Sequence, residues 1–139
     1  MNLHTIKYPI GMANIPKQIT KKNIEDWIFV LETFPQNLEY LTRSLSDNQL
    51  DTPYREKGWS IRQVVHHCYD SHHNSYIRFK WALTEDKPTI KFYYEQDWAE
   101  LADAKYAPIE GPCTEVVNVP EEVTRVLCYR CTSRSASGK

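Results

Sequence analysis

The stretch GWSIRQVVHHCYDSHHNSYIRFKWAL, residues 58–83, decides how the rest of this 139-residue chain is interpreted. Four of the five histidines lie in it, and apolar residues recur through it at three- and four-residue steps. Such spacing is typical of an amphipathic helix. Ser60 can cap its start, and the polar run that ends at Pro88 closes it near Leu83. The sequence therefore predicts one long helix that carries most of the imidazole groups.

His72 lies on the apolar face of this helix. With about 100° between successive residues, that face comprises Ile61, Val65, Cys68, His72, Tyr76, Phe79 and Leu83. A histidine in such a stripe is more often a core residue with satisfied hydrogen bonds than a metal ligand. We therefore expect His72 to be buried.

A polar stripe lies on the opposite side of the helix. His66, Asp70 and His73 stand at i, i+4 and i+7, which lets three side chains of one helix meet a common ion. The same pattern is frequent on solvated helix faces, and from the residues alone we favour the solvated interpretation. The periodicity gives no special role to His67, which lies on a third side with Ser71, Asn74 and Arg78.

A second helix is predicted before this one. Thr20 can cap a helix over 21–45. Its core-facing stripe is Ile24, Trp27, Ile28, Leu31, Phe34, Leu38, Leu41 and Leu45. Pro35 removes a backbone donor inside the helix and is expected to kink or split it. Residues 46–58 are expected to be a polar connection, and a short helical stretch is expected at 97–102.

Length and composition limit the number of domains, the kinds of partner and the cellular location that we expect. We expect a single domain over 1–139, because the length and a hydrophobic share of 41% suffice for one core. Seventeen Lys and Arg against eighteen Asp and Glu give a net charge of -1, which disfavours nucleic acid or an anionic membrane as a partner. No apolar run suggests a signal peptide or a membrane span, so a cytoplasmic protein with reduced cysteines is expected.

A resemblance to a known family adds to this interpretation. YPIG near the start and LSDNQLDTPYREKGWSIRQVVHHCYDSHHNSYIRFKWALTEDKPTIKFYYEQDWAELADA after it resemble the YfiT-type branch of the DinB-like superfamily. Its members are cytoplasmic metal-dependent hydrolases and include bacillithiol S-transferases. The resemblance implies an all-α four-helix bundle of the up-down-down-up type, often a homodimer, that acts on a small-molecule substrate. It also implies a divalent ion, zinc or nickel, and a low-molecular-weight thiol as co-substrate.

The resemblance singles out His67 as a metal ligand. The family takes one histidine ligand from its second helix, eight residues after the tryptophan that opens it, and here that tryptophan is Trp59. His66, Asp70 and Asn74 also match the family and would orient a ligand or the substrate. Their alternative roles are helix solvation, packing and an interhelical hydrogen bond. The other two ligands of the family come from a later His-x-x-x-His helix.

The chain departs from the family after Glu110. Residues 111–139 contain no histidine, and their last part resembles a disordered tail. A frameshift that leaves the bundle incomplete at its C-terminus is one hypothesis. Cys128 and Cys131 form a C-x-x-C pair that could supply substitute ligands, although a lone pair is a weak signal. Within the single domain we therefore separate an extended segment over 1–19, a family-like helical part over 20–110 and a divergent tail over 111–139.

Three functional hypotheses follow from these patterns. The first is a metal-dependent hydrolase or thiol S-transferase that works through His67 and is inactive if its other ligands are missing. The second is a non-catalytic helical protein that dimerises or binds a partner. The third is a defective, truncated product with no function of its own. Metal content separates the first hypothesis from the other two.

Overall fold

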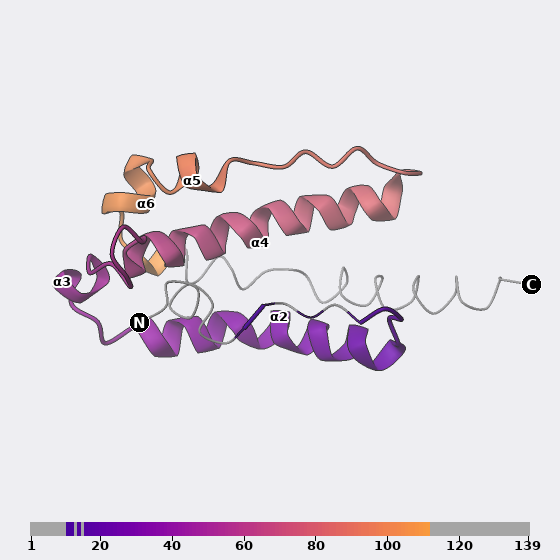
Figure 1. Ribbon diagram of the computed structural model, residues 1–139, viewed down its shortest axis with the longest axis horizontal. Coiled ribbons are helices and arrows are strands. Elements are labelled where there is room, and N and C mark those ends of the chain that lie inside the picture. The colour runs from indigo at the N-terminus through magenta and orange to yellow at the C-terminus, as the bar shows by residue number, and fades with distance from the viewer. Residues whose placement is uncertain (1–10, 13, 15, 112–139) are drawn as a thin grey trace, which may run out of the picture.

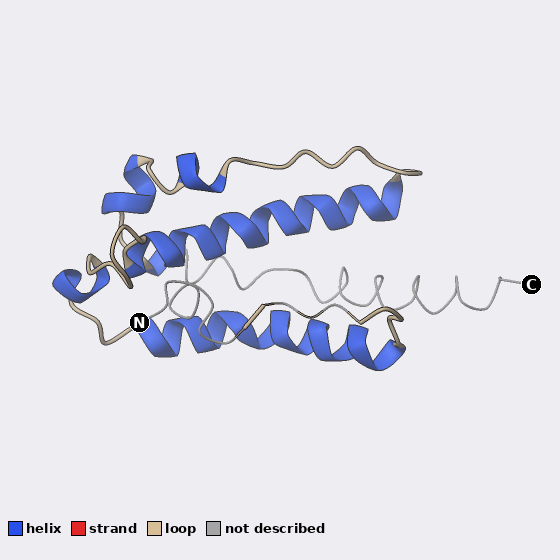
Figure 2. Cartoon of the chain, in the orientation of Figure 1, coloured by secondary structure: helices blue, strands red, loops and turns tan. Residues whose placement is uncertain are grey.

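The computed structural model of the chain describes residues 11, 12, 14 and 16–111. Its helices are α2 (Lys21–Thr42), α3 (Asp47–Leu50), α4 (Ile61–Thr84), α5 (Glu95–Trp98) and α6 (Ala102–Tyr106). These residues form no strand, and one isolated bridge pairs Pro53 with Ser60 (Figure 2). The prediction of an all-α protein is confirmed. Residues 1–10, the tail after Gly111 and the pair Cys128 and Cys131 lie outside the described residues.

Two long helices, α2 and α4, form the body of the fold. Figure 1 shows them running in opposite directions, with the segment after α4 returning along it to α5 and α6. The ring of Phe34 on α2 stacks on His72 of α4 at 4.9 Å between centroids. Arg78 on α4 donates a hydrogen bond to the Lys91 carbonyl at 3.2 Å, which ties the returning segment to the helix.

Both long helices begin where the sequence predicts. The side chain of Thr20 accepts a hydrogen bond from the Asn23 backbone, and that of Ser60 accepts one from Gln63. Each partner side chain bonds back to the backbone of the capping residue, so both starts are complete capping boxes. These caps satisfy backbone donors that the first helical turn leaves unpaired.

Pro35 does not divide α2 as expected. The helix runs unbroken over 22 residues, and Pro35 is buried within it. The proline removes a single backbone hydrogen bond, whereas the turns on either side of it remain bonded and pack through Phe34. Of the two expected effects of Pro35, a kink or a split, the split is therefore wrong.

The core lies where the end of α2, α3 and the start of α4 meet. Leu50, Val65 and Ile109 are buried together there. Leu38, Leu45 and Ile61 pack against them. Residues 46–58, predicted to be a polar connection, contain the four-residue helix α3. The last residue of α3, Leu50, is part of this core. In place of the single short helical stretch predicted at 97–102, two short helices, α5 and α6, lie on either side of Leu101.

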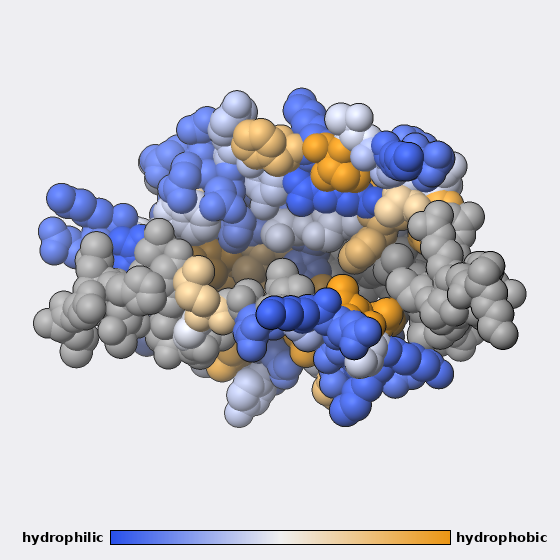
Figure 3. Space-filling model, turned by 45° about the vertical axis from the view of Figure 1, so that its right-hand side comes forward, coloured by the Kyte–Doolittle hydropathy of each residue, from blue (hydrophilic) through white to orange (hydrophobic). Residues whose placement is uncertain are grey.

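The predicted apolar stripe of α2 is only partly covered. Trp27 is 43% exposed and Leu41 is 68% exposed, so their predicted core positions are not realised in this structure. On the face that Figure 3 shows, apolar side chains reach the surface between hydrophilic ones. Other large exposed apolar residues of α2 are Phe29, Val30 and Tyr40. In the described part of the chain, no helix is long and apolar enough to cross a membrane.

Candidate functional site

His67 lies half-buried in an aromatic environment near the start of α4. Its ring centroid is 4.9 Å from that of Trp59 and 6.5 Å from that of Tyr93. Tyr93 in turn packs on Trp98 of α5 at 4.7 Å. No sequence pattern singles out Tyr93. The structure brings it to His67 because the segment after α4 turns back along the helix.

A pocket of about 350 Å³ opens beside His67. Residues from the turn before α4 and from the start of α5 line it together with the imidazole: Tyr54, Arg55, Lys57, Gly58, Trp59, Glu95 and Gln96. Its volume lies at the lower end of the range for small-molecule sites, about 300–1,000 Å³. The pocket therefore suits a small ligand that reaches His67.

Tyr93 covers the side of α4 that carries His67 and Ser71. Burial raises the pKa of the Tyr93 phenol, and the negative charges of Asp70 and Glu95 add to this rise. A hydrogen bond with Ser71 and the positive charge of Arg78 oppose it. The Arg78 guanidinium lies 5.9 Å from the Tyr93 ring centroid. The phenol thus stays protonated at neutral pH and can act as a hydrogen-bond donor.

Asp70 is the other perturbed group near His67. Burial raises the pKa of its carboxyl group, and Asp103 on α6 raises it further. The nearby imidazoles of His67, His66 and His73 lower it in part. A carboxylate in this position places negative charge next to His67. In a metal site, such a charge favours a cation and increases the basicity of its ligands.

Asp70→Asn is expected to stabilise the fold at neutral pH. Because folding raises the pKa of Asp70, its ionised form is less favourable in the folded chain than in the unfolded one. The substitution removes this penalty. The gain should vanish as the pH falls below the ordinary pKa of a carboxyl group, where Asp70 is protonated in both states. Urea denaturation of both chains at about pH 7 and about pH 3 measures the difference. An equal gain at both pH values would contradict the assigned cause.

The side-chain amide nitrogen of Asn74 forms its hydrogen bond within α4 and not with a neighbouring helix. That nitrogen donates a hydrogen bond of 2.8 Å to the Asp70 carbonyl, one turn back on the same helix. Because the nitrogen is used in this bond, the side-chain oxygen of Asn74 is the atom that could orient a ligand. Asn74 is half-buried, so a ligand could reach it.

The polar stripe of α4 is only partly solvated. His66 is only 6% exposed, whereas Asp70 is half-buried and His73 is exposed. The α6 helix packs on this side of α4, and its Ala104 is buried. The His66 Nε2 atom lies 3.4 Å from the Ala107 carbonyl oxygen. The solvated interpretation is therefore wrong for His66, because local periodicity does not reveal that α6 covers it.

His72 is half-buried rather than fully buried. Its Nδ1 donates a hydrogen bond of 2.7 Å to the Cys68 carbonyl, and its ring stacks on Phe34. Its Nε2 atom is buried and has no hydrogen-bond partner in the described structure. These contacts favour the packing role that the sequence suggested for His72.

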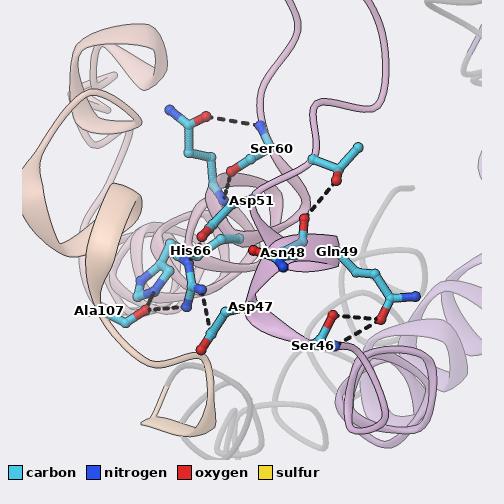
Figure 4. A network of polar contacts seen from close by, with 11 residues as sticks. Ser46, Asp47, Asn48, Gln49, Asp51, Ser60, His66 and Ala107 are labelled. Carbon is cyan, nitrogen blue, oxygen red and sulfur yellow. Dashed lines mark hydrogen bonds and ion pairs between the residues drawn. The ribbon is translucent and has the colours of Figure 1, made fainter.

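Arg62 connects the start of α4 to α3 and to the chain after α6 through hydrogen bonds. Its side chain is 7% exposed, and the guanidinium donates hydrogen bonds to Asp51 at 2.7 Å, Asp47 at 2.8 Å and the Ala107 carbonyl at 3.0 Å. Figure 4 shows Asp47, Asp51, His66 and Ala107 converging on one network. Bonds to the two carboxylates raise the pKa of Arg62. The network fixes α3, α4 and the chain after α6 relative to one another, close to the pocket.

The described residues do not assemble a complete metal site. They contain no group of three His, Cys, Asp or Glu side chains that could hold an ion. The hypothesis that His66, Asp70 and His73 share an ion therefore has no support from the geometry. His67 has the chemistry and the partial exposure of a single ligand. Any further protein ligands would come from residues outside the described part.

The sequence and the fold match a known class of proteins. Residues 31–118 match the DinB superfamily, so the chain belongs to this superfamily. The match extends slightly past Glu110, where the sequence resemblance was expected to end.

The most informative similarities are to Bacillus proteins. A protein of Bacillus cereus strain B4264 and one of Bacillus anthracis strain A0248 are each 52% identical over 103 residues, and both are named "Putative metal-dependent hydrolase". The matches cover 74% of this chain and 60% of each relative, so the chain spans about 60% of their length.

A solved structure is similar to this one over most of the chain. It is YfiT from Bacillus subtilis, described as "a probable metal-dependent hydrolase with an unusual four-helix bundle topology". The sequence identity is 45% and the TM-score 0.82, over 88% of this chain and 70% of YfiT. The predicted family and the four-helix bundle fold are confirmed.

Proposed function

We propose that this chain contributes to a metal-dependent enzyme in which His67 is one ligand of a divalent ion, zinc or nickel. The observation that carries the proposal is the placement of His67. It lies half-buried against Trp59, beside Tyr93, and at the wall of a pocket of about 350 Å³. A ligand there would hold an ion within reach of a small molecule. The names of the relatives support metal-dependent hydrolysis.

The chain's own residues would prepare the site for such an ion. Trp59 and Tyr93 fix the plane of the His67 ring and restrict water around it. Asp70 adds negative charge beside the imidazole. A bound zinc or nickel ion supplies Lewis acidity, which lowers the pKa of a bound water or thiol toward neutrality. Hydrolysis and transfer of a thiol to an electrophile both use that property.

Both reactions belong to the proposal. The substrate would be a small molecule, with water as the nucleophile in a hydrolase and a low-molecular-weight thiol of the bacillithiol kind in an S-transferase. We further propose a cytoplasmic homodimer, as the family resemblance implies. His66 and Asn74 would support the ligand or the substrate, and Cys128 or Cys131 would be the substitute ligands if no other histidine completes the site.

A metal-exchange assay tests the proposed function. The chain is stripped with EDTA, reloaded with zinc or nickel, and assayed for hydrolysis of a phenyl ester and for transfer of cysteine to 1-chloro-2,4-dinitrobenzene. At zinc or nickel concentrations high enough to fill a site that a single histidine holds weakly, the proposal expects one of the two rates to rise on reloading and to fall again in His67→Ala. Rates that are equal in the stripped, reloaded and His67→Ala proteins would contradict it.

One observation favours a non-catalytic alternative. Trp27, Val30, Tyr40 and Leu41 on α2 are exposed, and such an apolar surface is typical of an interface. A helical dimerisation or partner-binding protein would use it without any metal. This alternative expects the EDTA-treated chain to stay folded and dimeric with no metal-dependent rate. Light scattering together with the same assay distinguishes the two functions.

A further inference from the structure

Beside His67, the pocket carries two positive charges from a single turn. Arg55 and Lys57 both belong to the segment between α3 and α4 and both line the pocket. In the described part of the chain, neither forms an ion pair with a carboxylate. Glu95, at the start of α5, is the acidic residue of the lining. The side chains of the lining therefore carry a net charge of +1 at neutral pH, counting two cations against one carboxylate.

The turn that presents these charges is tightly closed. The Tyr54 amide donates to the Trp59 carbonyl at 3.2 Å, and the Gly58 amide donates to the Arg55 carbonyl at 3.0 Å. Lys57 has a φ of 55°, a left-handed conformation that is unusual for a lysine. A Cβ on Gly58 would lie 2.6 Å from Cγ of Arg55. Gly58 therefore lets Arg55 sit directly against the turn backbone.

Local contacts hold Arg55 while leaving part of its guanidinium available. Nε donates to the Tyr54 hydroxyl at 2.9 Å, and Nη1 donates to the Glu56 carbonyl at 3.2 Å. The guanidinium carbon lies 5.2 Å from the Tyr54 ring centroid. Among the described residues, Nη2 has no hydrogen-bond partner. A guanidinium held in this way loses little freedom when it binds an anion.

We infer that Arg55 and Lys57 select substrates that carry a carboxylate, which they hold in the pocket beside His67. An arginine fork and an ammonium group both suit a carboxylate. The aromatic rings of Tyr54 and Trp59 would contact the apolar part of the same molecule. A singly charged group is favoured over a phosphate dianion, because one negative charge balances the net charge of +1 and a dianion loses more hydration when it enters the pocket. The inference rests on the proposed function only in taking this pocket as the substrate site.

Three matched probes test the inference without any metal. Benzoate, benzamide and phenyl phosphate are titrated into the EDTA-treated chain while the indole N–H signal of Trp59 is followed by NMR. Benzoate should bind more tightly than its neutral analogue benzamide and at least as tightly as phenyl phosphate. For exposed charge pairs, the expected preference over benzamide is about fivefold. Equal affinities for benzoate and benzamide, or a clear preference for phenyl phosphate, would overturn the inference.

Variants that remove single charges test whether Arg55 and Lys57 cause the preference for benzoate. Arg55→Gln and Lys57→Asn should each lower the benzoate affinity by about threefold and leave the benzamide affinity unchanged. Asparagine is chosen because it tolerates the positive φ at position 57. Glu95→Gln removes the negative charge of the lining and should therefore strengthen benzoate binding. If the two cation variants bind benzoate like the unmodified chain, the cations do not select the ligand. Circular dichroism checks that each variant is folded.

Gly58→Ala tests the closed turn independently of charge. The added Cβ would collide with Arg55 and would come within 3.1 Å of the Tyr54 ring. It should therefore lower the benzoate affinity while all charges remain. Unchanged affinity in a folded variant would contradict the role of the turn. Because these experiments use the stripped chain, metal binding that does not depend on His67 would refute only the proposed function. A missing benzoate preference would refute only the inference.

Discussion

His67→Ala is expected to lower the affinity of the chain for zinc or nickel by at least about tenfold, because it removes the ligand that we propose. The His67 imidazole lines the pocket and lies close to the rings of Trp59 and Tyr93. Competition titration against a chromophoric chelator measures the affinity for each metal. The loss should be similar for zinc and nickel, because both accept a neutral imidazole.

His66→Ala is the matched control for His67→Ala. The two histidines are adjacent, but His66 is buried against the Ala107 carbonyl under α6 rather than at the pocket. Its loss should weaken packing and leave metal affinity nearly unchanged. The opposite result, with affinity retained in His67→Ala and lost in His66→Ala and His73→Ala, would move the site to the polar stripe.

Arg62→Ala is expected to destabilise the fold by about 3 kcal/mol, because it removes charge-assisted hydrogen bonds and a buried side chain together. Two of the lost bonds reach Asp47 and Asp51, and a third reaches the Ala107 carbonyl. The apolar stem of the arginine would also leave space next to the core. Urea denaturation followed by circular dichroism measures the change.

Two controls separate the contributions of Arg62. Arg62→Met keeps most of the stem and should cost about 2 kcal/mol, since only the polar contacts are lost. Asp47→Asn should cost less than about 1 kcal/mol, because the Asp47 side chain is 86% exposed. A chain with Arg62→Met that is as stable as the unmodified chain would show that the ion pairs contribute nothing net to stability.

Local sequence signals predicted the two long helices well. Thr20 and Ser60 are followed three residues later by side chains that complete a capping box, and the apolar steps of α4 continue almost to its observed end. Both signals act within a few residues of chain, so they are visible in the sequence. Pro35 shows the limit of such signals, because the surrounding helix tolerates a missing hydrogen bond.

The environment of the candidate site could not be predicted from local patterns. Tyr93 reaches His67 because the chain after α4 turns back, and no periodicity encodes that course. His66 and Arg62 have polar side chains that suggest exposure, yet both are buried under contacts from distant residues. His67 was singled out only by its spacing from Trp59 in a family motif. The contact between these two rings is consistent with that spacing.

Residues 111–139 contain no histidine that could be one of the two other ligands implied by the family, since the five histidines of the sequence are His4, His66, His67, His72 and His73. His4 lies outside the described residues. Open catalytic zinc sites normally use three protein ligands. A single histidine from α4 would therefore hold an ion weakly. The relatives are longer than the segment that this chain matches. We therefore propose to test whether their remaining part completes the site around His67.

The most direct test is a zinc titration of this chain and of a chimera in which residues 111–139 are replaced by the segment that follows the matching position in YfiT from Bacillus subtilis. Each protein is titrated with and without His67→Ala. We expect the chimera to bind one zinc ion per chain far more tightly than the unmodified chain, and His67→Ala to abolish that gain. Retention of the gain in His67→Ala would contradict the role of His67. Equally tight binding by the unmodified chain, lost when Cys128 and Cys131 are replaced, would show instead that its own C-terminal segment completes the site.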